Sequence, residues 1–101
     1  MTAARAWIAD RVGHAPSELR LRILRDIAPV EATIPLPDAL AAAGSAALER
    51  ALAAPADRAS ALDLLAADGL ITLALLAQAE VGPEGLGEFA ERLVHVYSAR
   101  T

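Results

Sequence analysis

The chain has no cysteine, no lysine and few aromatic residues, and each shortage excludes a class of chemistry. Without cysteine there are no disulfides, no thiolate metal sites and no cysteine nucleophile. Without lysine there is no Schiff-base chemistry and no P-loop lysine for phosphate. The aromatic residues are Trp7, Phe89 and Tyr97 alone. We therefore expect a core built by the close approach of small side chains.

What the 101 residues do contain is alanine and leucine, 26 and 16 of them, in a composition that is 55% hydrophobic. This composition argues against intrinsic disorder, and the length fits a single domain over residues 1–101. All nine basic residues are arginine, against 13 acidic residues, so the net charge is −4. The bias towards alanine and arginine indicates a GC-rich bacterial source. We expect no nucleic-acid binding, because Arg20, Arg22 and Arg25 do not share one helix face.

Neither a targeting segment nor a membrane span is expected. Arg5 and Arg11 interrupt the N-terminus, where a signal peptide needs an apolar run. The most apolar stretch, residues 61–77, contains Asp63 and Asp68. Each aspartate costs about 2.5–3.5 kcal/mol at the centre of a membrane-spanning helix. We therefore expect a cytoplasmic protein.

Apolar residues recur at helical spacing along most of the chain, whereas strand signals are sparse. Glycine, proline and capping residues divide this pattern into five expected helices, over residues 3–11, 17–27, 38–53, 57–80 and 83–99. The sequence thus predicts an all-α fold, a compact bundle of about five helices. The helix over 57–80 is apolar on all sides, which is typical of a central or interface helix.

Local features add three expectations about the first half of the chain. Ser17 is expected to cap the second helix. The charge ladder of Glu18, Arg22 and Asp26, spaced four residues apart, is expected on a solvent-facing side. The linker over residues 28–37 is expected to be pinned to the core by its apolar residues, Val30, Ile34 and Leu36.

Asp68 is the most anomalous residue, because it lies in mid-helix among leucines and isoleucine. A buried, unpaired carboxylate there costs several kcal/mol. We expect Asp68 either at the rim of the core or paired with an arginine of the first two helices; the alternative is a functional acid. Asp63 lies on a milder face and is expected to be exposed. Gly69 costs about 1 kcal/mol relative to alanine in a helix, which suggests close approach of another helix.

Catalytic and metal-binding patterns are weak. No nucleophile motif surrounds any serine, so we expect no enzymatic activity and no cofactor. Glu88, Glu91 and His95 share one face of the last helix, which leaves a metal site as a minor alternative. Their simpler interpretation is a solvated polar face.

The sequence indicates more apolar helix surface than 101 residues can hide. We therefore expect a non-enzymatic interaction module that pairs with itself as a homodimer or serves as an accessory subunit of a larger assembly. The candidate interface residues are Gly44, Leu64, Asp68, Gly69, Ile71 and Leu75. The alternative function is binding of a small apolar ligand between helices, next to Asp68.

Overall fold

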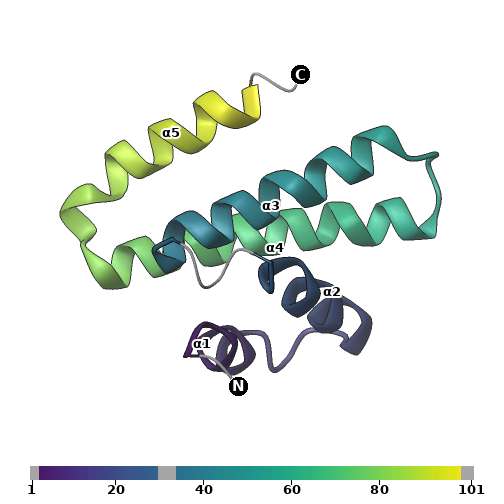
Figure 1. Ribbon diagram of the computed structural model, residues 1–101, viewed down its shortest axis with the longest axis horizontal. Helices are drawn as coiled ribbons and strands as arrows, with labels where there is room; N and C mark the ends of the chain where they lie inside the picture. Colours follow the sequence, from purple (N-terminus) through teal and green to yellow (C-terminus); the bar gives the residue numbers. More distant parts are fainter. Residues whose placement is uncertain (1–2, 30–33, 99–101) are drawn as a thin grey trace.

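A computed structural model describes residues 3–29 and 34–98 of the chain. Within these residues the chain forms five α-helices and one short 3₁₀ helix, with no strand (Figure 1). The elements are α1 (Ala3–Arg11), α2 (Ser17–Ile27), α3 (Leu36–Ala53), α4 (Arg58–Val81), η1 (Pro83–Gly85) and α5 (Leu86–Ser98). The predicted all-α bundle of about five helices is therefore confirmed.

The centre of the molecule is the hairpin of α3 and α4, which lie side by side and antiparallel (Figure 1). Small residues recur every four positions along α3 at Ala39, Ala43 and Ala47, and all three are buried. Ala66, Leu70 and Ala74 of α4 are buried as well. Alanine loses no side-chain entropy on burial and lets two helix backbones approach closely. The shortage of bulky residues is thus met by a tight helix pair.

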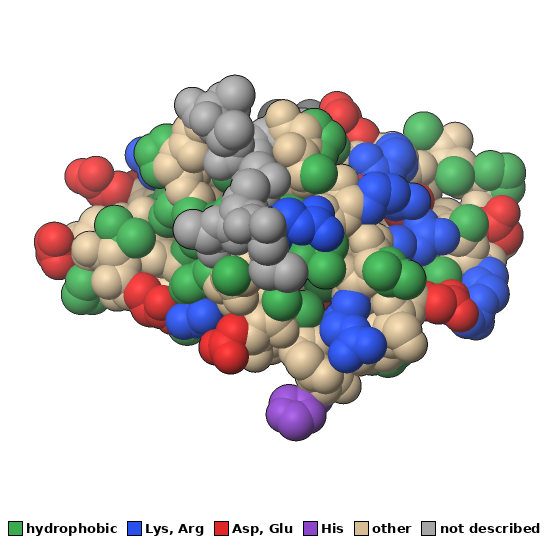
Figure 2. Space-filling view, turned by 60° about the horizontal axis from the view of Figure 1, so that its bottom comes forward, with side chains coloured by type: hydrophobic (Ala, Val, Ile, Leu, Met, Phe, Trp, Pro, Cys, Tyr) green, Lys and Arg blue, Asp and Glu red, His purple; other side chains and the backbone are tan. Residues whose placement is uncertain are grey.

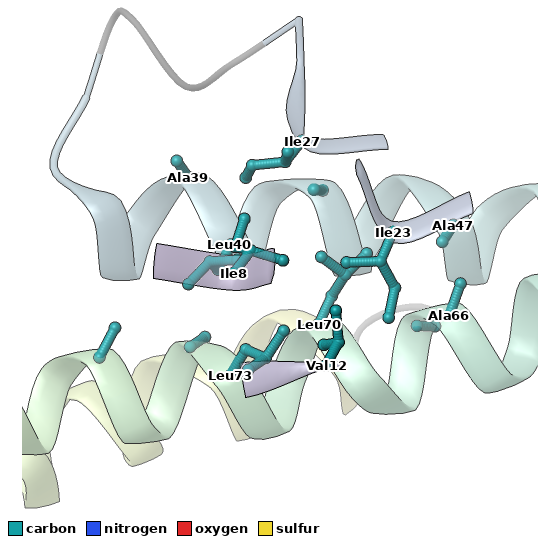
Figure 3. Packing of buried hydrophobic residues seen from close by; sticks show 14 of the residues in the cluster. Ile8, Val12, Ile23, Ile27, Ala39, Leu40, Ala47, Ala66, Leu70 and Leu73 are labelled. Carbon is teal, nitrogen blue, oxygen red and sulfur yellow. The ribbon is translucent and has the colours of Figure 1, made fainter. Parts of the chain in front are cut away.

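The short helices α1 and α2 pack against this hairpin with their branched side chains. Ile8 of α1 and Ile23 and Ile27 of α2 are almost completely buried against Leu40 and Leu70 (Figure 3). Each such side chain contributes about 1.5–3 kcal/mol through removal of its surface from water. The residues that hold the bundle together therefore come from four different helices.

The C-terminal helix α5 turns back along the hairpin after η1 (Figure 1). Phe89 is its buried anchor, and Leu93 packs partly against the core. Further along α5, Val94 and Val96 are exposed.

The helix starts differ from expectation where proline is involved. Pro16 occupies the N-cap of α2 and no side chain caps this helix, so the prediction that Ser17 is the cap is wrong. Helix α3 begins at Leu36 instead of residue 38, because Pro37 fits the first turn, where its missing N–H needs no partner. Helix α4 begins after a capping box in which Asp57 accepts from the Ser60 backbone N–H at 2.9 Å.

The linker expectations have mixed outcomes. Ile34 is exposed, so it does not pin the linker to the core. Leu36 packs partly against the core as expected. Val30 lies outside the described residues.

Candidate functional site

The candidate site is the outer face of α4, where large apolar side chains meet solvent. Leu64, Leu65 and Leu76 are 48%, 52% and 42% exposed. Leu52 of α3 is also exposed, and Leu48 lies one turn before it. Single exposed leucines are common on proteins, but three of them on one helix form an apolar side that the described residues leave open.

A shallow groove of about 280 Å³ runs along this face between α3 and α4. It is lined by Leu48, Leu64, Ala67, Asp68 and Ile71. The small Ala67 forms its floor, since this residue is buried while Leu64 and Asp68 beside it are exposed. We refer to Leu48, Leu52, Leu64, Leu65, Asp68, Ile71 and Leu76 together as the α4 outer face.

Asp68 lies at the rim, as expected. Asp68 is exposed, and its carboxylate forms no ion pair with any of the described residues. Its backbone carbonyl accepts the Thr72 hydroxyl at 2.9 Å, which is a local contact within α4. The carboxylate therefore meets water and interrupts the apolar groove without entering the core.

The other predicted interface residues are placed in two different environments. Ile71 is half-buried in the groove, and Leu75 packs partly against the core. Gly44 is buried within α3, and Gly69 faces α2, where an added Cβ would lie 3.2 Å from Ile23 Cδ1. The structure thus brings Leu64, Asp68 and Ile71 together and assigns Gly69 to packing within the chain.

Asp63 was expected to be exposed, and this prediction is wrong. The residue is buried, and its Oδ1 atom lies 2.8 Å from Nη1 of Arg22 in α2. Arg25 and Arg50 approach the same oxygen at 3.8 and 3.9 Å. The arginine partner that the sequence suggested for Asp68 therefore belongs to Asp63.

The charge ladder of α2 also differs from expectation. Arg22 packs towards α4, and the Asp26 side chain is only 4% exposed. Asp26 Oδ1 lies 2.9 Å from Nη2 of Arg50 and 3.3 Å from Nη2 of Arg25. Of the three ladder residues only Glu18 stays at the surface, where it accepts from Arg58 at 3.2 Å. The prediction of a fully solvated ladder is therefore wrong, because the ladder joins α2 to the central hairpin.

A separate polar cluster attaches α1 to the end of α4. The Trp7 indole N–H donates to Glu80 at 3.1 Å, and Arg11 donates to both Glu80 oxygens at 3.0 Å. The Arg11 guanidinium also stacks 4.0 Å from the centre of the Trp7 ring. The Trp7 and Arg11 hydrogen bonds hold the pKa of Glu80 below its usual value of 4.5. The arrangement is that of an ion pair that fixes one helix.

The geometry of α5 gives little support to the alternative of a metal site. Glu88, Glu91 and His95 are all exposed on α5 and border a surface hollow together with Arg92 and Val96. Over residues 3–29 and 34–98, no three His, Cys, Asp or Glu side chains are grouped so that they would hold a metal ion. Arg92 beside these carboxylates also places a positive charge where a cation would bind.

One described helix, Arg58–Val81, is long and apolar enough to span a membrane, with a mean hydropathy of 1.7 over an 18-residue window. In this structure 39% of that window is buried, and the core helix of a water-soluble bundle passes the same test of length and composition. Known proteins add no further information about the site. The chain matches no protein-family model, no curated protein and no solved structure.

Proposed function

We propose that this protein is a non-enzymatic interaction module that pairs with a second copy of itself through the α4 outer face. The observation that carries the proposal is the row of half-exposed leucines, Leu64, Leu65 and Leu76, on the longest helix of the chain. A helix that is apolar on all sides is favoured where neighbours cover all of it. Among residues 3–29 and 34–98, the other helices leave Leu64, Leu65 and Leu76 of α4 about half-exposed.

The dimensions of α4 also suit an interface between two copies. Its 24 residues give a length of about 36 Å. A standard interface buries about 800 Å² on each partner, which a helix face of this length and its flanking leucines can supply. The groove between Leu64 and Leu48 would receive an apolar side chain of the second copy. Asp68 lies within this face, one turn after Leu64, so its carboxylate would need an arginine or a bound water of the second copy as its partner in the interface.

Sedimentation equilibrium of the full chain at micromolar concentration tests the proposal, with Leu64→Glu as the disrupting variant. We expect a dimer for the unmodified protein and a dissociation constant at least about tenfold higher for the variant, because a buried glutamate has no partner there. Leu21→Glu is the matched control, since Leu21 is 67% exposed on α2 and outside the α4 outer face. A monomer at 100 µM, or equal effects of the two variants, would contradict self-association.

The alternative function, binding of a small apolar ligand, is supported by the same groove of about 280 Å³. Its apolar walls are provided by Leu48, Leu64 and Ile71. Native mass spectrometry of freshly purified protein distinguishes the two functions. A ligand gives a small added mass per chain, whereas pairing gives twice the mass of the chain.

A further inference from the structure

A second pocket, independent of the α4 outer face, lies where α2 crosses the central hairpin. It has a volume of about 480 Å³ and is lined by Arg22, Arg25, Arg50, Asp26 and Asp63, together with Pro29 and three alanines of α3. Figure 2 views the molecule from the side of α1 and α2, and arginine side chains gather next to one another on this face. The pocket thus combines a charged wall with an apolar one.

The charged wall carries a surplus of one positive charge. Three arginines face two aspartates there, although the net charge of the whole chain is −4. The described ion pairs bring Oδ1 of Asp26 and Oδ1 of Asp63 to within 4 Å of these arginines. Each guanidinium has five N–H donors, so three of them offer more hydrogen bonds than two carboxylates accept.

The aspartates hold the guanidiniums in position instead of filling the pocket. The side chains of Asp26 and Asp63 are 4% and 12% exposed, whereas those of Arg25 and Arg50 are 58% and 44% exposed. The Oδ2 atom of Asp26 is buried and accepts no hydrogen bond from the described part of the chain. This oxygen calls for a donor and would not contact a carboxylate, so the selection of an anion rests on the exposed guanidiniums alone.

We propose that this pocket binds a small organic acid with a single carboxylate on a short apolar body. The carboxylate would lie against the exposed guanidiniums of Arg25 and Arg50, whose planar donors match a carboxylate in a two-bond geometry. One negative charge neutralises the surplus of one. The apolar body would lie against the methyl groups of Ala42, Ala43 and Ala46.

NMR titration of the full ¹⁵N-labelled chain in low salt tests this proposal with three probes: butyrate, butyramide and inorganic phosphate. We expect butyrate to shift the signals of the pocket residues, and butyramide to bind at least about tenfold more weakly because it lacks the charge. The titrations are run at about pH 8, where phosphate is mostly a dianion and would leave the pocket with a net negative charge. If butyramide bound with the same affinity as butyrate, or phosphate bound more tightly than butyrate, the assignment would be overturned.

Arg25→Gln provides the matching variant, because Arg25 is the most exposed of the three arginines and its loss leaves the Arg22–Asp63 and Arg50–Asp26 pairs in place. We expect it to weaken butyrate binding about tenfold. Arg58→Gln is the control: this arginine also bridges α2 and α4, through Glu18, but does not line the pocket. Circular dichroism verifies that both variants fold. Equal losses in the two variants, or shifts spread over all arginines, would overturn the proposal, while the oligomeric state remains a separate measurement.

Discussion

Asp63 and Asp68 lie five residues apart on α4, and their surroundings are opposite. Asp63 is buried against three arginines, whereas Asp68 meets water. We expect Asp63→Ala to lower the free energy of unfolding by about 1–3 kcal/mol. This loss is smaller than the cost of breaking a fully buried ion pair. The Arg22 side chain is already 22% exposed, so water can hydrate its guanidinium once the carboxylate is gone. Urea denaturation measures the change.

The control for this prediction is Asp68→Ala, for which we expect a change within about 0.5 kcal/mol. Alanine also has a better helix propensity than aspartate, and this contribution is the same at both positions. If the two variants had equal stability, the ion pairs of Asp63 would contribute nothing to folding.

Gly69 allows a sharper test of packing between α2 and α4. An added Cβ would lie 3.2 Å from Ile23 Cδ1, which is the flexible end of its side chain. For Gly69→Ala, the gain in helix propensity of about 1 kcal/mol opposes the cost of moving Ile23, so we expect a net change within about 0.5 kcal/mol. For Gly69→Val, whose added volume cannot be absorbed there, we expect a loss of about 1–3 kcal/mol. Thermal unfolding compares the two variants, and a valine variant as stable as the alanine variant would contradict this close approach.

The environment of Asp63 shows that the residue pattern of one helix does not identify the partners of its side chains on other helices. Asp63 shares a face with Ala67, Leu70 and Ala74, and all three are buried. This spacing already indicated a buried position, but the small alanine side chains made this face of the helix less apolar than its other faces. The partner, Arg22, is 41 residues away in the sequence. Only the crossing of α2 over the hairpin brings it to Asp63, and helical periodicity does not specify that crossing.

At the scale of elements, the bounds of α1 and α2 coincide with the predicted ranges 3–11 and 17–27. Gly13 and Pro16 separate these helices clearly, because both residues are unfavourable inside a helix. The early start of α3 was missed because Pro37 was taken as part of the linker, although proline is favoured in a first helical turn. The single continuous α4 was predictable because no proline interrupts residues 58–81.

The attachment of α1 depends on pH through Glu80. Because the folded-state pKa of Glu80 is depressed below 4.5, the contact stabilises the fold above that pH and is lost as the pH falls through the folded value. We expect acid to release α1 from the end of α4. Fluorescence of Trp7, the only tryptophan, would report this release as a transition below about pH 4.5.

Glu80→Gln is the matched variant, because the amide oxygen still accepts from Trp7 but carries no charge for Arg11. We expect its Trp7 fluorescence to lack the transition below about pH 4.5. A transition of the same size in the variant would assign the effect to other carboxylates.

At the scale of the whole molecule, the use of small residues explains both the tight hairpin and the exposed leucines. Alanines let α3 and α4 approach closely, but a narrow hairpin has two open sides. The helices α1 and α2 cover one of them with Ile8, Ile23 and Ile27. Because α4 is apolar on every side, its sequence pattern did not specify which side the chain would cover. Its exposed side, with Leu64 and Leu65, is therefore apparent only from the packing of the other helices.

If that exposed side pairs two copies, the stability of the fold must depend on protein concentration. Unfolding of a dimer releases two chains, so a hundredfold rise in concentration stabilises each chain by about 1.4 kcal/mol. For a domain of this size we expect the unfolding midpoint to rise by about 5–10 °C between 1 and 100 µM. Differential scanning fluorimetry with an extrinsic dye measures the midpoint at both concentrations, and Leu64→Glu should abolish the dependence. A midpoint that is constant over this range would show that the leucines of α4 remain in water and that the chain folds as a monomer.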